Sequence, residues 1–270
     1  MINVMLCGNN KMYDGLLIST ISMIKYLQEP VNMYVVTADL RDVDERYVPI
    51  DQIQINKLDE IVKKKNPESN VVLVDITEMF REEMMNTVNM TTHYTPYIFL
   101  RLFADKIEEL PDKILYLDTD IVCYKDIKEL YDTNIDNYEF AAAKDYFGMW
   151  FIDRKYINSG VLLMNLKKMR ENNSLNNCRK MCMEKKMLLP DQTALNEVCK
   201  AKYYLPRKYN EQKQRSDDTV IRHFSMTIKF WPWFHTLNIK PWNVNEIHEI
   251  YKINDFDDVL DEYLKVKGEN

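Results

Sequence analysis

Two aspartates stand at the end of an apolar, β-branched segment of the chain. The segment KILYLDTDIVC, residues 113–123, has the composition of a buried strand and carries Asp118 and Asp120. Residues i and i+2 of a strand point to the same face, so we expect the two carboxylates side by side, with Thr119 turned away. Two like charges this close repel unless a proton or a cation lies between them. Because hard carboxylate oxygens suit Mg²⁺ or Mn²⁺, the pair indicates a divalent-metal site, with a solvated turn as the alternative.

The segments before this pair alternate between strand-like and helix-like patterns. We expect buried strands at residues 2–8, 32–38 and 70–76, and helices at residues 15–27, 50–65 and 97–107. In the second helix Ile53, Leu58 and Val62 lie at helical spacing. This alternation predicts a mainly parallel sheet covered by helices on both faces, and ligands of such sheets bind beyond the carboxyl ends of the strands. The two aspartates would therefore lie at this rim and not in the core.

The pattern loosens after residue 123, yet strand-like and helix-like segments still follow each other. We expect strands at residues 139–145, 156–166, 201–210 and 219–226, and helices at residues 175–187, 191–200 and 254–266. No Gly- or Ser-rich linker divides the chain. We therefore expect one α/β domain at residues 1–243, with residues 244–270 as a C-terminal helical extension packed on the same domain.

The composition narrows the class of partner and the compartment. The 270 residues are 46% hydrophobic and carry 42 acidic against 36 basic side chains, a net charge of −6 without a basic tail. We expect no nucleic-acid partner, because the sequence contains no cluster of basic residues that could bind along a phosphate backbone. We expect no secretory signal, because Met1 leads straight into the strand-like residues 2–8 without a charged n-region, an apolar h-region or a cleavage site. We expect no transmembrane segment, since no apolar run reaches about 18 residues. Five scattered cysteines predict reduced thiols and a cytoplasmic protein, with peripheral contact at the inner face of the membrane left open.

Five segments resemble motifs of one known family, in the order of that family. LYLDTDIV resembles the DxD motif of nucleotide-sugar glycosyltransferases with the GT-A fold. YIFLRLF resembles the helix that delivers a donor-binding arginine, and YINSGVLLMNL, LPDQTALN and IRHFSMTIKFW resemble N-[SA]-G-V-x-L-[IM]-N-L, D-Q-x-x-L-N and H-[FY]-x-G-x-x-K-P-W. Together these matches are similar to glycosyltransferase family 8, which includes glycogenin-like and bacterial lipopolysaccharide galactosyltransferase-like enzymes. The resemblance implies a GT-A-type, Rossmann-like α/β domain with a short C-terminal helical and aromatic segment.

The resemblance implies a manganese site made by three side chains. In the family the two DxD aspartates and the histidine of H-[FY] bind the ion, and here these are Asp118, Asp120 and His223. The chemistry agrees, because two carboxylates and one imidazole form an ordinary donor set for Mn²⁺, with Mg²⁺ as the other candidate. The alternative for His223 is a histidine with satisfied hydrogen bonds in the core.

The resemblance also implies the residues that hold the sugar donor. Lys229 matches the lysine that holds the diphosphate, and Arg101 matches the donor-contacting arginine, with a helix-surface ion pair as its alternative role. Further donor contacts would come from Cys7, Gly8, Asn9, Met12, Thr119, Asn158, Ser159 and Met226. The catalytic positions would be Asp145, which grips the sugar hydroxyls, and Asp191 and Gln192, which lie nearest the reacting carbon. Asp191 could instead cap the helix that begins in PDQTALN.

The reaction that the resemblance implies is the metal-dependent transfer of a hexose from a UDP-sugar, with retention of the anomeric configuration. The donor would be UDP-glucose or UDP-galactose, and the acceptor hydroxyl would belong to a carbohydrate, a lipid-linked sugar or a protein. The expected setting is the synthesis of bacterial lipopolysaccharide, polysaccharide or a glycoconjugate. Departing charge on the diphosphate would be neutralised by the ion and by Lys229.

Several positions depart from the family pattern and keep alternatives open. Met12 stands where an aromatic residue stacks on uracil, with Tyr13 next to it; Met226 replaces a glycine and Phe230 a proline. A nucleotide-sugar-binding protein with impaired catalysis is therefore one alternative. A phosphatase of the haloacid dehalogenase type is a weaker one, because Val122 stands where that class has Ser or Thr. The tryptophan-rich residues 230–242 suit packing over the domain, an acceptor platform or an interfacial belt.

Overall fold

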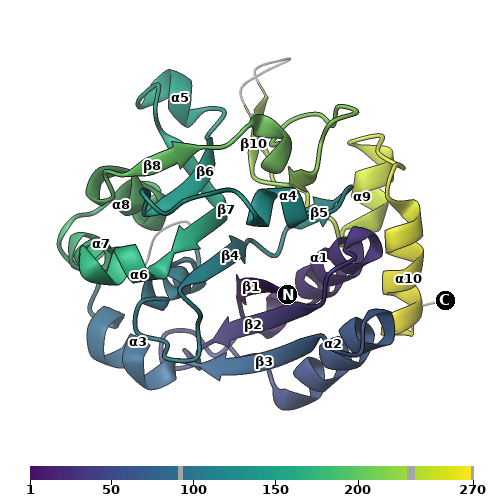
Figure 1. Cartoon of the computed structure of the whole chain (residues 1–270), viewed down its shortest axis with the longest axis horizontal. Coiled ribbons are helices and arrows are strands. Elements are labelled where there is room, and N and C mark those ends of the chain that lie inside the picture. The colour runs from purple at the N-terminus through teal and green to yellow at the C-terminus, as the bar shows by residue number, and fades with distance from the viewer. Residues whose placement is uncertain (91–93, 230–234, 269–270) are drawn as a thin grey trace.

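A computed structural model describes residues 1–90, 94–229 and 235–268 of the chain (Figure 1). Its central sheet has the strand order β3-β2-β1-β4-β7-β6-β8. The strands of this sheet are β1 (Ile2–Cys7), β2 (Val31–Thr37), β3 (Asn70–Asp75), β4 (Lys113–Leu117), β6 (Phe140–Lys144), β7 (Ile157–Asn165) and β8 (Lys202–Tyr204). The helices are α1 (Tyr13–Tyr26), α2 (Gln52–Lys65), α3 (Thr77–Met84), α4 (Lys128–Tyr131), α5 (Gly148–Phe151), α6 (Leu166–Glu171), α7 (Ser174–Glu184), α8 (Pro190–Val198), α9 (Val244–Glu249) and α10 (Asp257–Lys267). The 3-10 helices among the described residues are η1 (Asn10–Met12), η2 (Pro96–Phe103) and η3 (Arg207–Tyr209).

The sheet is mainly parallel, as the alternating pattern predicts. Strands β3, β2, β1 and β4 run parallel, and β8 runs parallel to β6. Strand β7 runs against both of its neighbours, β4 and β6, which the sequence did not reveal. Because it is antiparallel, β7 begins at the rim where β4 ends, with Leu117 paired to Val161. The start of β7 therefore lies beside the segment that follows β4.

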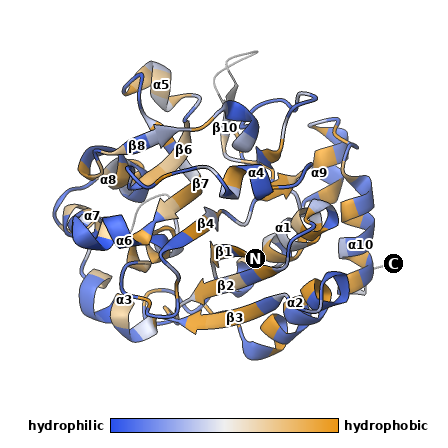
Figure 2. Cartoon of the chain, in the orientation of Figure 1, coloured by the Kyte–Doolittle hydropathy of each residue, from blue (hydrophilic) through white to orange (hydrophobic). Residues whose placement is uncertain are grey.

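Strand β1, in the middle of the parallel part, buries both of its faces. Along β1, Val4 and Leu6 join the apolar cluster that contains α1 and α2, while Met5 and Cys7 join the opposite cluster, which contains η2, α7 and α8. Figure 2 shows the central strands as hydrophobic ribbons and the outer faces of the helices as mixed or hydrophilic. Continuous apolar strands of this kind are expected where helices cover both faces of a parallel sheet.

Two expected helices differ in detail from the structure. The segment expected to be helical from residue 97 is the 3-10 helix η2, which starts at Pro96. Helix α2 begins with a capping box between Asp51 and Gln54. Ile53, which the helical spacing assigned to the apolar face, is 78% exposed, and the helix instead buries Ile55 together with the expected Leu58 and Val62.

The segments that carry the metal-site residues are shorter than expected. Asp118 and Asp120 do not lie on a strand, because β4 ends at Leu117 and the two aspartates belong to the turn that follows. The expected strand over residues 219–226 is reduced to β9 (Ile221–His223), which pairs antiparallel with β5 (Ile121–Cys123). A second small sheet joins β10 (Thr227–Lys229) to β11 (His235–Leu237). The expected strand at residues 201–210 contains only the three residues of β8.

The C-terminal helices pack on the same side of the sheet as α1. Ile247 of α9 and Val259, Leu260 and Tyr263 of α10 belong to the apolar cluster that contains α1, and Lys25 of α1 forms an ion pair with Asp258. The boundary at residue 243 stays a prediction. Among the described residues, no helix combines the length and the apolar character needed to cross a bilayer.

Candidate active site

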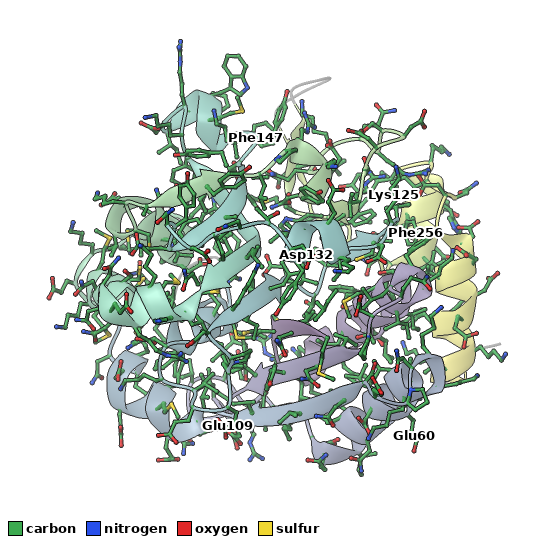
Figure 3. The ribbon with its side chains drawn as sticks, viewed as in Figure 1. Glu60, Glu109, Lys125, Asp132, Phe147 and Phe256 are labelled. Carbon is green, nitrogen blue, oxygen red and sulfur yellow. The ribbon has the colours of Figure 1, made fainter. Side chains whose placement is uncertain are left out.

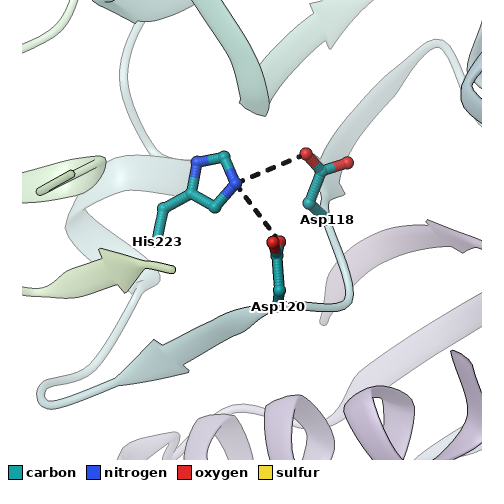
Figure 4. A group of neighbouring side chains, drawn as sticks. All are labelled: Asp118, Asp120 and His223. Atoms are coloured by element: carbon teal, nitrogen blue, oxygen red, sulfur yellow. Dashed lines mark ion pairs between the residues drawn. The ribbon is translucent and has the colours of Figure 1, made fainter. Parts of the chain in front are cut away.

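Asp118, Asp120 and His223 meet at the carboxyl end of β4, as Figure 4 shows. Their candidate ligand atoms all lie within 4.8 Å of one another. The Nε2 atom of His223 lies 3.2 Å from Oδ1 of Asp120 and 3.6 Å from Oδ2 of Asp118. Two carboxylates and one imidazole nitrogen converge on one point, which is the donor set that a divalent transition-metal ion prefers.

The small sheet of β5 and β9 brings the histidine to the aspartates. Its register pairs Ile121 with His223, and the backbone N–H of Phe224 donates a 2.9 Å hydrogen bond to the carbonyl of Asp120. On the other side, the backbone N–H of Asp118 donates to the carbonyl of Gly160 at 2.8 Å. Backbone pairing therefore fixes the positions of all three side chains, although His223 follows Asp120 by 103 positions in the sequence (223 − 120).

Two neighbours indicate that the cluster suits a metal ion. The Nδ1 atom of His223 lies 3.2 Å from Oδ1 of Asn210; donation from Nδ1–H leaves the Nε2 lone pair free to face the carboxylates. Gly160 borders the same space: a Cβ atom there would lie 2.2 Å from Cε1 of His223 and 2.9 Å from Oδ2 of Asp118. The space between the ligand atoms depends on this glycine, and the residues present fit a bound divalent ion.

The local charges favour the ionised form of this cluster. Burial opposes the charged imidazolium of His223, but the attraction of Asp120 and Asp118 outweighs burial and raises the pKa of His223. Burial likewise opposes the ionised form of Asp120. Lys240 and His223 outweigh it and hold the pKa of Asp120 well below its usual range. Asp120 therefore carries its negative charge at neutral pH.

Lys240 is a site residue that the sequence reasoning did not assign. Its Nζ atom lies 2.6 Å from Oδ2 of Asp120 and donates to the carbonyl of Phe224 at 2.9 Å. The signal in the sequence was the tripeptide Lys240-Pro241-Trp242, which repeats the K-P-W end of the H-[FY]-x-G-x-x-K-P-W pattern 11 residues after Lys229. A cation of the chain itself thus neutralises one of the metal-site carboxylates.

Arg101 links the metal cluster to the catalytic candidates. Its side chain is only 6% exposed, which rules out the helix-surface ion pair considered for it. The guanidinium lies 2.9 Å from Oδ1 of Asp118 and 3.4 Å from Oδ2 of Asp191, and it donates to the carbonyl of Ser159 at 2.8 Å. A hydrogen bond from Tyr116 to Asp118 completes this buried network. One arginine therefore sets the relative positions of two carboxylates.

Asp145, Asn158 and Gln192 form a second polar network at the same rim. Oδ2 of Asp145 accepts hydrogen bonds from Nδ2 of Asn158 at 2.8 Å and from Nε2 of Gln192 at 3.3 Å. Oε1 of Gln192 accepts from the backbone N–H of Ser159 at 3.0 Å. The side-chain oxygen of Asn158 accepts from the backbone N–H of Gly160 at 3.0 Å. These predicted sugar-binding residues lie together. Gly160, whose backbone N–H binds Asn158, separates them from the metal cluster.

Asp191 does not cap its helix, contrary to the alternative considered for it. Helix α8 begins at Pro190, and its N-cap residue is Leu189, which has no capping side chain. The Asp191 carboxylate is buried and faces Arg101 and the hydroxyl of Ser159, which lies 3.3 Å away. Burial raises its pKa, against the attraction of Arg101. A buried carboxyl group whose pKa is shifted by burial and opposed by one specific cation is a feature of sites that do chemistry.

The predicted donor-binding residues of the first βα turn lie at the end of β1. Cys7 ends the strand, and burial raises the pKa of its thiol to about 12, so it stays a neutral thiol. The Met12 side chain packs against Gly8, where an added Cβ would lie 3.1 Å from the sulfur. Tyr13 turns away, because its hydroxyl donates to the carbonyl of Gln54. Met12, not Tyr13, therefore borders the turn.

Asn9 carries an unsatisfied acceptor in this turn. Its side chain is 2% exposed, and its Oδ1 atom accepts no hydrogen bond within the described part of the chain. A buried polar atom without a partner costs free energy and calls for an explanation such as a ligand. The start of α1, which follows this turn, packs closely on the metal-site turn, since a Cβ at Gly15 would lie 2.6 Å from the carbonyl oxygen of Thr119.

The remaining candidates lie in the segment after β9. Met226 is half-buried in the turn between β9 and β10. Lys229 ends β10, and its backbone pairs with His235. The side chain of Lys229, and the residues 230–234 that hold Phe230 and two of the tryptophans, lie outside what the structure describes. The expected role of Lys229 therefore stays a prediction.

Comparisons with known proteins relate this geometry to sequence relatives. Glycosyltransferase GlyA of Streptococcus pneumoniae is 30% identical over 164 residues, which are 60% of this chain and 20% of GlyA. A putative glycosyltransferase of Haemophilus influenzae is 25% identical over 85% of this chain and 72% of its own length. Lipopolysaccharide 1,2-glucosyltransferase of Escherichia coli is 28% identical over 50% of this chain and 48% of its own. The chain spans about a fifth of the length of GlyA and 18% of the probable glycosyl transferase Gly of Streptococcus gordonii.

Solved structures share the fold over the whole chain. A structure of LgtC, described as a galactosyltransferase in complex with donor and acceptor sugar analogs, has a TM-score of 0.66 at 17% identity and covers 97% of this chain and 95% of its own. The bifunctional enzyme WbbM has a TM-score of 0.70 at 16% identity, over 100% of this chain and 51% of its own. The expected GT-A-type α/β fold is confirmed. The sequence model described as Glycosyl transferase family 8 matches residues 3–246, and the chain therefore belongs to that family.

Proposed function

We propose that this chain is a metal-dependent, retaining hexosyltransferase that uses a UDP-sugar donor. The observation that carries the proposal is the convergence of Asp118, Asp120 and His223 next to Gly160, at the rim where α/β sheets bind ligands. A divalent ion held there, Mn²⁺ or Mg²⁺, would neutralise the diphosphate of the donor and the charge that develops on it. Membership of a glycosyltransferase family supports the same reaction class and removes the support for a phosphatase.

The uridine would bind at the turn after β1. The unsatisfied Oδ1 of Asn9 is a hydrogen-bond acceptor, and the imide N–H of uracil is a matching donor. The Met12 side chain beside Gly8 offers a thioether face to the base in place of an aromatic ring. Cys7 and Thr119 complete the lining of this end of the site as neutral groups. These contacts support a pyrimidine base that carries an N–H donor.

Two lysines are candidates for the cation that faces the leaving diphosphate. Lys240 lies 2.6 Å from Asp120, so its Nζ atom is already at the edge of the metal cluster. We propose that Lys240 shifts from Asp120 to a phosphate oxygen when the donor binds, because both are anionic acceptors. Lys229, which matches the lysine of the family pattern, stays the second candidate, and Met226 would border the same diphosphate.

The hexose would lie between the two polar networks. Asp145, held by Asn158 and Gln192, would accept hydrogen bonds from the sugar hydroxyls. Asp191, fixed by Arg101, would place its negative charge near the carbon that becomes oxocarbenium-like in the transition state. The acceptor hydroxyl would attack from the face that the diphosphate leaves, with a departing phosphate oxygen taking its proton. This same-face displacement retains the anomeric configuration.

The acceptor is assigned by chemical class only. Relatives include a lipopolysaccharide glucosyltransferase and several streptococcal glycosyltransferases, which supports a sugar hydroxyl in a lipopolysaccharide, polysaccharide or glycoconjugate as the acceptor. A lipid-linked sugar and a protein hydroxyl fall in the same reaction class. Glucose and galactose differ by the orientation of one hydroxyl, and both are proposed as donor sugars.

A donor-hydrolysis assay tests the proposal without knowledge of the acceptor. The purified chain is mixed with Mn²⁺ and with UDP-glucose or UDP-galactose, and the release of UDP is measured. We expect release to depend on the ion and to fall at least 100-fold in Asp120→Asn, because a neutral amide oxygen replaces an anionic ligand. The variant should fold normally, since Asp120 lies in a turn at the rim and its replacement opens no cavity.

The outcomes separate the proposal from its alternative. Asp126→Asn, which changes an acidic residue outside the cluster, serves as the matched control and should keep wild-type UDP release. Saturable UDP binding without any release above background would support an impaired binding protein instead. Full activity of Asp120→Asn in its folded fraction would overturn the assignment of the metal site.

A further inference from the structure

Helix α5 presents an apolar surface that the proposed reaction does not use. Trp150 is 72% exposed, Phe151 71% and Ile152 58%, three large apolar side chains in succession. Scattered single apolar residues are normal on a protein surface, but a contiguous group indicates an interaction site. In Figure 1 this helix projects from the body of the molecule, and in Figure 3 its side chains extend beyond the ribbon above Phe147.

Two basic side chains follow the apolar group after one exposed acidic residue, Asp153. Arg154 and Lys155 are exposed, and neither forms an ion pair within the described residues, although the chain as a whole is acidic with a net charge of −6. The exposed Lys144 lies just before the helix. Exposed aromatic rings next to unpaired cations are the composition of a surface that enters the headgroup region of an anionic bilayer.

The helix is held firmly in this projecting position. Oδ1 of Asp145 accepts hydrogen bonds from the backbone N–H groups of Phe147 at 3.1 Å and Gly148 at 2.6 Å. The rings of Phe147 and Phe151 stack at 6.4 Å between centroids. Gly148 packs so closely on Tyr156 that a Cβ atom there would lie 2.3 Å from its ring. The apolar group is therefore presented on a supported turn, so little conformational entropy is lost when a partner covers it.

We propose that α5 and the basic residues after it, residues 148–155, dock this chain onto an anionic lipid bilayer. Trp150, Phe151 and Ile152 enter the interface, while Arg154 and Lys155 contact the anionic headgroups. Asp145 ties this surface to the active-site rim through its other carboxylate oxygen, which binds Asn158. The inference rests on the exposed surface alone and holds whether or not the proposed transfer reaction occurs.

Sedimentation with lipid vesicles tests this proposal. The full chain is mixed with vesicles of phosphatidylcholine alone or of phosphatidylcholine with phosphatidylglycerol, and the bound fraction is measured against lipid concentration. We expect binding to the mixed vesicles that weakens as salt is added. Arg154→Gln with Lys155→Gln should weaken it on the order of 25-fold, from about fivefold for each cation near an anionic surface. Trp150→Ser with Phe151→Ser should weaken binding to the mixed vesicles at least tenfold.

Matched controls keep the test decisive. Ile53→Ser removes an equally exposed apolar residue, 78% exposed, from α2 at the bottom of Figure 1, and it should leave vesicle binding unchanged. All substituted side chains are exposed, and circular dichroism of each variant checks its fold. Wild-type protein that fails to bind the mixed vesicles overturns the proposal. So does wild-type binding by Trp150→Ser with Phe151→Ser, or a loss of soluble-oligosaccharide binding in that variant while vesicle binding persists.

Discussion

Lys240 competes with the metal ion for Asp120, and its removal should tighten metal binding. Its Nζ atom lies 2.6 Å from Oδ2 of Asp120, and the side chain is 21% exposed. Oδ1 of the same carboxylate faces His223, where we expect a divalent ion to bind. The ion would draw charge from the carboxylate, so we expect the ion pair with Lys240 to weaken when the metal binds. Lys240→Met keeps the length of the side chain and removes the charge.

The size of the effect follows from the geometry. Hydrogen bonds to charged groups contribute about 1.5–3 kcal/mol net, and every 1.4 kcal/mol corresponds to a factor of ten. Lys240→Met should therefore bind Mn²⁺ about 10- to 100-fold more tightly than the wild type. If Lys240 also moves to the diphosphate of the donor, the same variant should release UDP more slowly despite its tighter metal binding. Opposite changes in the two quantities distinguish a competing cation from a residue that only supports the fold.

Isothermal titration of Mn²⁺ into the metal-free protein measures the affinity, and the loss of the free-ion magnetic resonance signal checks it. Lys125→Met removes one positive charge outside the site, where Lys125 donates to the carbonyl of Asp217, and corrects for the change in net charge. A Lys240→Met variant that binds Mn²⁺ no more tightly than Lys125→Met would refute this account of the ion pair.

Two further changes test the space and the charges of the site. Gly160→Ala should lower Mn²⁺ affinity by at least tenfold, because its Cβ would lie 2.2 Å from Cε1 of His223. Titration calorimetry measures the affinity. Unchanged affinity in a folded variant would contradict the claim that the space between the metal ligands depends on Gly160. Asp191→Asn should gain thermal stability relative to the wild type as pH rises. Burial raises the pKa of Asp191, so the folded protein holds its proton more tightly than the unfolded chain does, and wild-type stability falls as pH rises from the ordinary carboxyl pKa through the raised one. Melting curves of both proteins without metal, below and above this window, measure the difference; equal pH profiles would count against the raised pKa.

Local sequence patterns were sufficient for the covered parallel sheet. The continuous apolar runs at residues 2–8, 32–38, 70–76 and 113–117 are strands because a buried parallel strand needs apolar residues on both faces. The order of the five motifs along the chain was sufficient to predict the family. It was not sufficient for the direction of β7, since an antiparallel central strand buried on both faces has the same apolar pattern as a parallel one.

The candidate site shows the same division. Asp118 and Asp120 face His223 as expected, but they do so from a turn, so the alternation of strand side chains was the wrong reason for a correct pairing. The strands β5 and β9 are three residues each, too short to carry a period that could be read. Lys240 was missed because its contact with Asp120 spans 120 positions. The contact depends on the path by which the segment after β9 comes back to the metal-site turn.

The sequence by itself therefore determined which segments are buried, which family the chain belongs to and which residue types could bind a metal. Those properties are local, because burial selects apolar side chains and ligand chemistry selects carboxylates and imidazole. Only the tertiary structure decided which groups meet. It placed Gly160 against His223, Lys240 on Asp120 and Arg101 between two carboxylates, because such contacts arise from strand register and chain return across long separations.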